Sequence, residues 1–116
     1  MTTRAVPLLQ GTLELLILAS LRNGTGLHGF EILRWIHDTS SAALTIEEGS
    51  LYPALHRMED RGWITAEWGI SERGRRAKYY RIAPPGRRQL AHEERTWLAY
   101  VEAVTRLLQA ARVATA

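Results

Sequence analysis

Apolar residues recur every three or four positions along three segments in the first half of the chain, which is the period of an amphipathic α-helix. The first predicted helix covers residues 8–22 and ends at the glycine-containing stretch "RNGTG". The second covers residues 28–39, and the third carries "EEGSLYPALHRMEDRG" up to its final glycine. Because Pro53 has no backbone donor, we expect the third helix either to begin near Gly49 or Ser50, with proline in its first turn, or to bend at the proline.

Aromatic and β-branched residues are concentrated in the two segments that follow, residues 63–68 and 78–83, which predicts two strands. The glycine-containing loop "GISERGRRA" joins them into a hairpin. The stretch "PPG" is expected to break the chain, and one long helix is expected over residues 87–112. The predicted fold is mainly α with a β-hairpin (α+β): a winged helix-turn-helix domain (residues 1–83) and a long C-terminal helix (residues 84–116).

A glycine motif between the first two predicted helices raises a different possibility. Gly24, Gly26 and Gly29 have the G-x-G-x-x-G spacing of a dinucleotide-binding loop, and the acids Glu47 and Glu48 follow about 20 residues later, where such a fold binds the ribose. That loop needs a preceding strand, whereas here the preceding segment has helical period. The chain is also too short for a doubly wound sheet. We therefore interpret the glycines as a sharp turn between two short helices.

The composition excludes several kinds of site. The chain has no cysteine, so it has no disulfide, thiolate metal site or cysteine nucleophile, which fits a cytoplasmic location. Its four histidines lack metal-ligand spacing, and neither a serine-hydrolase elbow nor a phosphate-binding loop occurs. No apolar run is long enough to span a membrane. We expect no enzyme, no cofactor, no metal site and no membrane partner.

Basic residues are concentrated around the predicted hairpin, where seven of the fifteen lysines and arginines fall between residues 73 and 88. The loop contains Arg73, Arg75 and Arg76, and the returning strand contains Lys78 and Arg81. Fixed positive charge on a rigid element suits phosphates and a narrow minor groove. The alternative is a loop that is charged only for solubility, but such loops usually mix both signs.

The third predicted helix has one apolar and one polar face when it is projected at about 100° per residue. The apolar stripe consists of Leu51, Leu55 and Met58, and the opposite face consists of Pro53, His56, Arg57 and Asp60. Hydroxyl groups of Ser50 and Tyr52 lie on the flanks, where they can reach a phosphate. A polar face is also found on any surface helix, so this helix alone does not decide for DNA contact.

The stretch "EGSLYPALHRMEDRGWI", followed by "GRRAKYYRI", a proline-glycine sequence and a long helix, resembles the PadR family of bacterial transcriptional regulators in its small form. The apolar first helix and "HGFEIL" extend the resemblance to nearly the whole chain. It implies that the third helix enters the major groove, that the hairpin wing touches the backbone or minor groove, and that the last helix builds a homodimer with the partner's first helix. Phe30 stands where members often have tyrosine, so a hydroxyl contact to phosphate is lost there.

The resemblance and the charge pattern together give one set of expected DNA contacts. They are Ser50, Tyr52, Pro53, His56 and Arg57 in the third helix, and Arg73, Arg75, Arg76 and Lys78 in the wing. The helix residues are expected to recognise sequence, and the wing residues are expected to bind phosphates.

Apolar residues of the last predicted helix fall on alternating spacings of four and three, as in a helix seam. The stripe consists of Leu90, Trp97, Val101, Val104, Leu108 and Ala111, with Glu94 as its one polar member. So small a domain does not cover a stripe of this length, and we expect a second copy of the chain to cover it. A two-fold dimer presents two reading helices to two half-sites, so the expected operator is an inverted repeat.

Trp97 suggests a ligand site. In small PadR-like members a tryptophan in this helix can line a cavity at the dimer interface where flat aromatic compounds stack, and the resemblance implies the same for Trp97. Plain interface packing is the alternative. Glu94, one turn earlier, would favour a cationic guest, unless it is solvated or pairs with Arg95 or with Arg106 of the partner subunit.

The expected function is sequence-specific DNA binding by a homodimeric transcriptional regulator, a repressor that a small planar aromatic effector releases. The alternative is a homodimeric interaction or ligand-binding module without specific DNA binding. Such a module would share the long helix but would have no use for the arginine-rich wing.

Overall fold

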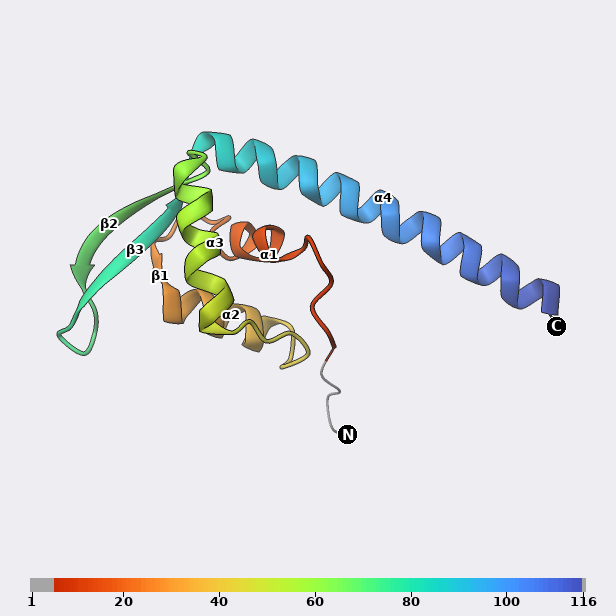
Figure 1. Ribbon diagram of the computed structural model, residues 1–116, viewed down its shortest axis with the longest axis horizontal. Coiled ribbons are helices and arrows are strands. Elements are labelled where there is room, and N and C mark those ends of the chain that lie inside the picture. Colours follow the sequence, from red (N-terminus) through yellow and green to blue (C-terminus); the bar gives the residue numbers. More distant parts are fainter. Residues whose placement is uncertain (1–5, 116) are drawn as a thin grey trace.

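A computed structural model describes residues 6–115 as three short helices, a three-stranded sheet and one long helix (Figure 1). In chain order the elements are α1 (Leu13–Ser20), β1 (Leu27–His28), α2 (Gly29–Thr39), α3 (Glu48–Asp60), β2 (Ile64–Ile70), β3 (Arg76–Ile82) and α4 (Pro84–Thr115). The predicted α+β class, a winged helix-turn-helix with a long C-terminal helix, is confirmed. Residues 1–5 and 116, at the ends of the two predicted domains, lie outside the described residues.

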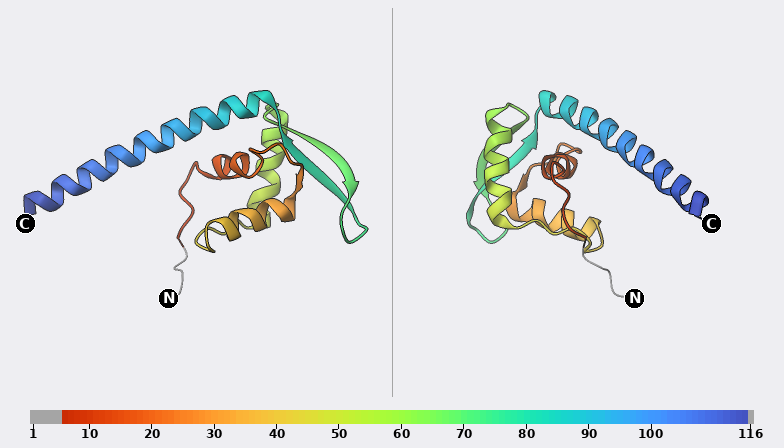
Figure 2. Two further views of the ribbon diagram at one scale, coloured as in Figure 1. Left: turned by 180° about the vertical axis from the view of Figure 1, so that it is seen from behind. Right: turned by 45° about the vertical axis from the view of Figure 1, so that its right-hand side comes forward.

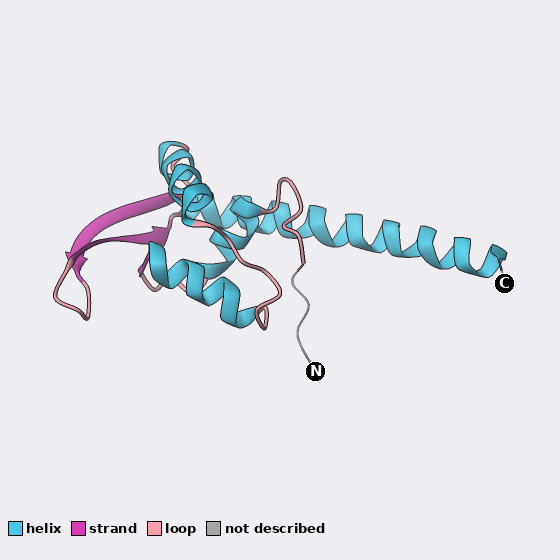
Figure 3. Cartoon of the chain, turned by 60° about the horizontal axis from the view of Figure 1, so that its bottom comes forward, coloured by secondary structure: helices cyan, strands magenta, loops and turns pink. Residues whose placement is uncertain are grey.

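One apolar core is formed by the three short helices, the base of the hairpin and the beginning of α4. It consists of Ile17, Leu18, Leu21, Ile32, Ile36, Ile46, Leu51, Ala54, Leu55, Met58, Ile64, Tyr80, Ile82 and Leu90. The sheet order is β1-β3-β2, with both pairs antiparallel. The hairpin of β2 and β3, residues 64–82, is called the wing here, and its tip projects away from the helices (Figure 3).

The first helix is shorter than predicted, because it begins at Leu13 and not at residue 8. Gly11 has a left-handed backbone conformation (φ +86°), which a helix through the preceding residues does not permit. The Thr12 hydroxyl donates a hydrogen bond to the Leu9 carbonyl at 2.6 Å and stabilises this turn. The apolar residues before Leu13 therefore belong to an irregular segment beside α4.

The glycine stretch after α1 forms a turn and then a short strand that the sequence analysis missed. Gly24 has φ +84°, as the turn interpretation requires, and a helix precedes it where a dinucleotide fold has a strand. In β1, Leu27 pairs with Tyr80 of β3. The His28 ring then accepts a hydrogen bond from the Glu31 N–H at 3.3 Å and caps α2. A strand of two residues has no alternation, so the hydrophobic pattern did not reveal it.

Pro53 lies inside α3, in its second turn, because the helix begins at Glu48. The prediction that the proline would occupy the first turn is therefore wrong. The N–H groups of Ser50 and Leu51 both donate to the Glu47 carbonyl, at 3.0 and 3.1 Å, and form the first turn without the proline. Pro53 cannot donate to the carbonyl four residues earlier, but that residue is exposed, so water can hydrate the carbonyl.

The "PPG" sequence begins α4 and does not break the chain, which corrects the prediction of a break. Both prolines occupy the first helical positions, where a backbone N–H has no acceptor within the helix. Gly86 is buried against the Trp63 carbonyl, and an added Cβ would overlap that oxygen. α4 therefore follows β3 after the single residue Ala83 and extends far from the other elements (Figures 1 and 2).

Candidate nucleic-acid interface

α3 presents the two faces that its sequence predicted. The buried side consists of Leu51, Ala54, Leu55 and Met58, and the exposed residues include Ser50, Tyr52, Pro53, His56, Arg57 and Asp60. In the view of Figure 1, α3 lies in front of the other helices, so its polar side is accessible to a large partner. All five residues expected to read DNA from this helix are therefore on the surface.

Tyr52 connects α3 to the beginning of α2. A Cβ on Gly29 would lie 2.5 Å from the Tyr52 hydroxyl oxygen and 2.8 Å from Cζ, so the tyrosine ring packs directly on the glycine. The ring is still half-exposed. The third glycine of the G-x-G-x-x-G motif is thus needed for contact between two helices, and the same contact fixes a phenol hydroxyl beside the N-terminus of α2.

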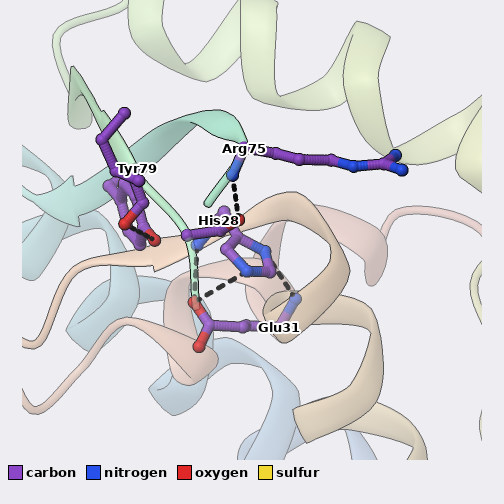
Figure 4. Close-up of polar contacts among 6 residues, drawn as sticks. His28, Glu31, Arg75 and Tyr79 are labelled. Atoms are coloured by element: carbon purple, nitrogen blue, oxygen red, sulfur yellow. Dashed lines mark hydrogen bonds and ion pairs between the residues drawn. The ribbon is translucent and has the colours of Figure 1, made fainter. Parts of the chain in front are cut away.

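A cavity of about 800 Å³, the wing cavity, lies between the first turns of α2, Tyr52 and the wing. Its basic lining residues are Arg34, Arg73, Arg75, Arg76 and Lys78, and its acidic ones are Glu31 and Glu72. Glu31 is engaged in capping α2, because its Oε1 accepts the His28 N–H at 3.1 Å (Figure 4). The cavity therefore carries an excess of positive charge.

Arg73 and Arg75 project from the tip of the wing. The loop is closed by hydrogen bonds from the Gly74 N–H to the Ser71 carbonyl at 2.9 Å and from the Ser71 N–H to the Arg75 carbonyl at 2.7 Å. Figure 4 shows the Arg75 side chain extending away from the capped end of α2. Within the part of the chain that the structure describes, neither guanidinium has an ion-pair partner.

Lys78 and Arg81 have partners within the chain that the sequence analysis did not predict. The Lys78 Nζ lies 3.2 Å from Oε1 of Glu59 on α3. The Arg81 guanidinium donates to the Gly24 carbonyl at 2.9 Å. Lys78 also lies 5.8 Å from the ring centroid of Tyr80, and burial raises the pKa of that hydroxyl. Lys78 therefore connects the wing to α3, Arg81 connects it to the turn before β1, and the charge of Lys78 is compensated.

Arg76 is held by an aromatic side chain. Its guanidinium lies 4.5 Å from the ring centroid of Trp68, which is 58% exposed. The stacked arrangement restricts the guanidinium without neutralising it. Sequence analysis assigned no role to Trp68, although it lies two residues before the end of β2 and directly opposite Lys78 in the sheet.

Two of the α3 residues expected to contact DNA lie close to acidic residues of the same chain. Arg57 Nε lies 3.9 Å from a carboxylate oxygen of Glu14, which also pairs with Arg61 at 3.3 Å. His56 Nε2 lies 3.5 Å from Asp60 one turn later. The His56–Asp60 contact lies at the surface, where such contacts contribute little to stability, and Arg57 reaches the less exposed Glu14 only at the limit of an ion pair.

The predicted stripe on α4 is only partly on the surface. Leu90 is 4% exposed and belongs to the core of its own chain, so it is not accessible to a second copy. Val101 and Leu108 are 39% and 63% exposed, and Trp97 and Val104 are partly buried. Further large apolar residues that the stripe omitted are exposed on α4: Leu98, Tyr100, Leu107 and Val113.

A second cavity, of about 590 Å³, lies between residues 9–15 and α4 and is named the α4 cavity here. Trp97 and Tyr100 line it, and its acidic residue is Glu93. Glu94, which the sequence placed beside Trp97, is not in the lining. Its Oε1 accepts a hydrogen bond from Arg22 at 2.7 Å. The acidic residue that lines this cavity is therefore Glu93 and not the predicted Glu94.

No group of three or more histidine, aspartate or glutamate side chains among residues 6–115 could hold a metal ion. The histidines are dispersed: His28 caps α2, and His37 lies 3.2 Å from Asp38. No helix in the same residues is both long and apolar enough to cross a membrane.

Three comparisons connect this geometry to known proteins. A family model described as the transcriptional regulator PadR-like family matches residues 17–92. A transcriptional regulator of Mycobacterium tuberculosis is 34% identical over 62 residues, which cover 53% of this chain and 57% of that protein.

Solved structures share both the fold and part of the sequence. A PadR family transcriptional regulator from Eggerthella lenta is 31% identical with a TM-score of 0.73, covering 85% of this chain and 83% of that one. A transcriptional regulator from Clostridium thermocellum is 28% identical with a TM-score of 0.75, covering 84% and 93% of the two chains.

Proposed function

The chain belongs to the PadR-like family of transcriptional regulators, and we propose that it binds a specific operator as a homodimer and represses transcription. In this proposal α3 enters the major groove and the wing follows the adjacent phosphates and minor groove. The site of action is the cytoplasm, where a bacterial chromosome is accessible.

The observation that carries the proposal is that α3 and the arginines at the tip of the wing line one cavity. Tyr52 of α3 and the wing residues Arg73, Arg75 and Arg76 line the same cavity. The guanidinium groups at the tip have no acidic partner among the described residues, so they are available to phosphates. A face with a rigid helix and unpaired cations matches the shape and charge of duplex DNA.

The proposed contacts divide by chemistry. His56 and Arg57 are assigned to base edges, because their donors project from the exposed face of α3. Hydroxyls of Ser50 and Tyr52 are assigned to phosphates, and Pro53 to apolar contact in the groove. The wing contributes phosphate contacts through Arg73, Arg75 and Arg76. Lys78 supports the wing through Glu59 and adds a weaker phosphate contact.

The homodimer is supported by the exposed apolar side chains of α4. Val101, Leu107 and Leu108 lie on the half of the helix that extends beyond the domain (Figure 2). A contiguous apolar surface on a long free helix favours a second helix as its cover. Two-fold symmetry would then pair each α3 with one half-site of an inverted repeat.

We further propose that a planar aromatic effector binds beside Trp97 and lowers the affinity for the operator. This proposal is supported by the place of Trp97, which is partly buried and lines the α4 cavity, where an aromatic guest would stack on its indole. Such an effector regulates only if it binds the DNA-incompetent dimer more tightly than the competent one.

The test is a titration of the purified protein with the duplex that flanks its own gene and with a shuffled duplex, each over a range of salt concentrations. We expect tighter binding to the flanking duplex and a steep linear fall of log affinity with log salt. Absence of duplex binding at low salt by a protein that is still dimeric would instead identify a dimeric interaction module without DNA.

A further inference from the structure

The face of the hairpin that covers the core continues outward along the wing. Alternate residues of β2 and β3 share this face, because successive side chains of a strand point to opposite sides of the sheet. Those at its base are buried in the core: Ile64, Tyr80 and Ile82. Those of its outer half are Trp68, Ile70, Arg76 and Lys78. Trp68 and Ile70 are 58% and 70% exposed, so the outer half of this face is not covered by the core of the chain.

Two cations and two aromatic rings on this face pair one to one. Nζ of Lys78 lies 5.8 Å from the ring centroid of Tyr80 and 3.2 Å from Oε1 of Glu59, so Lys78 is directed toward α3. The Arg76 guanidinium carbon instead lies 4.5 Å from the ring centroid of Trp68. Among residues 6–115 Arg76 has no ion-pair partner that would compete with the indole. The stacked guanidinium therefore keeps its full charge.

Tyr79 supports the strand that carries Trp68 from the opposite face of the hairpin. An added Cβ on Gly69 would lie 3.1 Å from Cδ2 and Cε2 of Tyr79, so the tyrosine ring packs on this glycine. The Tyr79 hydroxyl donates a hydrogen bond to the Ile70 carbonyl at 3.3 Å. The end of β2 is thus joined to β3 by side-chain contacts as well as by the strand pairing, and the indole stands on a firmly held part of the wing.

A guanidinium stacked on an indole keeps the groups with which arginine binds DNA. Stacking occupies the face of the guanidinium, whereas its N–H donors lie in the plane and stay free. An arginine that is already held in one orientation loses less conformational freedom when it enters a groove than an unrestrained one does. A narrow minor groove, as in a run of A·T pairs, concentrates the negative potential of the phosphates and attracts arginine.

We propose that Trp68 is a positioning residue for DNA binding, because its indole holds the Arg76 guanidinium in place to enter the minor groove beside the base pairs that α3 contacts. The wing then selects a narrow, A·T-rich groove over a wider, G·C-rich one. The proposal rests on the DNA binding proposed above and specifies which DNA the wing prefers. Arg73 and Arg75 stack on no ring among the described residues and remain assigned to phosphates.

The experiment uses the full-length protein and two versions of the operator duplex that the titration above identifies. Footprinting of the wild type and of Arg73→Ala first locates the base pairs that the wing covers, and these are made all A·T in one duplex and all G·C in the other. We expect the wild type to prefer the A·T duplex by about fivefold or more. Trp68→Ala should weaken binding to the A·T duplex by about two- to fivefold, as expected for loss of an exposed cation–π contact. Binding to the G·C duplex and the salt slope should change little, because the charge of Arg76 remains.

A double-mutant cycle with Arg76→Ala determines whether Trp68 acts through Arg76. Trp68→Ala should cause no further loss in the Arg76→Ala background, and Trp68→Phe, which keeps a ring, should retain most of the preference. Trp35→Ala, which removes an exposed tryptophan of α2, is the matched control and should leave the preference unchanged.

Two results for Trp68→Ala would overturn the proposal: an equal loss of affinity for both duplexes, or a loss that persists in the Arg76→Ala background. Equal binding of the two duplexes by the wild type would also overturn it, while the proposed DNA binding would stand. If the wild type binds no duplex at low salt, the proposed DNA binding fails and this proposal fails with it.

Discussion

The two cavities of this chain leave opposite charges unpaired. In the wing cavity Arg73 and Arg75 have no acidic partner among the described residues, and in the α4 cavity Oε2 of Glu93 has no donor. Lys78, by contrast, lines the wing cavity but is paired with Glu59. Guanidinium groups left unpaired at the surface indicate where a ligand of opposite charge would bind, whereas the buried Oε2 of Glu93 lowers stability.

The surroundings of the two cavities also differ, and they suit partners of different size. The wing cavity lies beside an exposed helix and a projecting hairpin, which suits an extended polyanion. The α4 cavity lies beneath an irregular segment and a long helix, which suits one small guest. The proposed DNA site and the proposed effector site therefore lie on different elements, and the predictions below test each site.

The largest effect is expected from charge in the proposed helix seam. Val101→Asp or Leu108→Asp would bury an unpaired carboxylate at a cost of several kcal/mol, because the partner helix excludes water from it. We expect dissociation of the dimer in light scattering and loss of operator binding, although α3 is unchanged. Gln109→Asp, on the opposite side of α4, is the matched control and should stay dimeric. A dimeric Leu108→Asp variant would place the interface elsewhere.

The next effect concerns the wing. Replacement of both Arg75 and Arg76 by alanine should weaken binding to every duplex by roughly ten- to a hundredfold at low salt and reduce the salt slope by about one unit per lost phosphate contact. His56→Ala or Arg57→Ala should mainly reduce the preference for the operator over a shuffled duplex. Arg106→Ala on α4 is the control for loss of charge. Unchanged affinity and slope in the wing variant would contradict a role for the wing in DNA binding.

A smaller effect of opposite sign is expected for Glu59. Glu59→Gln removes the acid that compensates Lys78, so Lys78 becomes available to a phosphate. We expect operator affinity at low salt to increase by roughly two- to fivefold, with a steeper salt slope. Glu102→Gln, which removes an ion pair on α4, should leave both quantities unchanged. A loss of affinity in Glu59→Gln would mean that the ion pair positions the wing and does not merely neutralise Lys78.

The smallest expected effect is on stability. Burial raises the pKa of the Glu93 carboxyl in the folded chain, so ionisation costs more there than in the unfolded chain, and the free energy of unfolding falls as the pH rises past the ordinary glutamate pKa. Glu93→Gln should therefore have a higher Tm than the wild type at neutral pH, by a few degrees. The difference should shrink as the pH falls and vanish below the ordinary glutamate pKa. Thermal unfolding followed by circular dichroism across pH, with Glu94→Gln as the control, measures it.

The hydrophobic period predicted the helices and the hairpin, because burial decides those elements. It placed Leu51, Leu55 and Met58 in the core and His56 and Arg57 on the surface, as found. It failed where a single residue determines the backbone conformation and therefore where a helix begins. A left-handed Gly11 delays α1, and two prolines fit the first turn of α4 without loss of a hydrogen bond.

The candidate site was less predictable than the fold, because charge alone does not say which groups are paired. Lys78 and Arg75 look equivalent in sequence, but Glu59, nineteen residues before Lys78, compensates only one of them. Likewise Glu93 and Glu94 are adjacent in sequence, but Glu93 lines the α4 cavity and Glu94 pairs with Arg22. Such pairings depend on contacts between distant elements, which periodicity does not contain.

The direct connection between β3 and α4 makes the long helix a mechanical lever. Ala83 alone separates them, its N–H donates to the Trp63 carbonyl at 2.9 Å, and Gly86 packs on the same carbonyl. With its 32 residues α4 is roughly 48 Å long, so a tilt of about 5° at one end displaces the other by about 4 Å. In the proposed dimer, a small change in the angle between the two α4 helices would change the distance between the two α3 helices by a comparable amount. The half-site spacing that the dimer can bind would then depend on the angle between the two α4 helices, which is set far from the DNA.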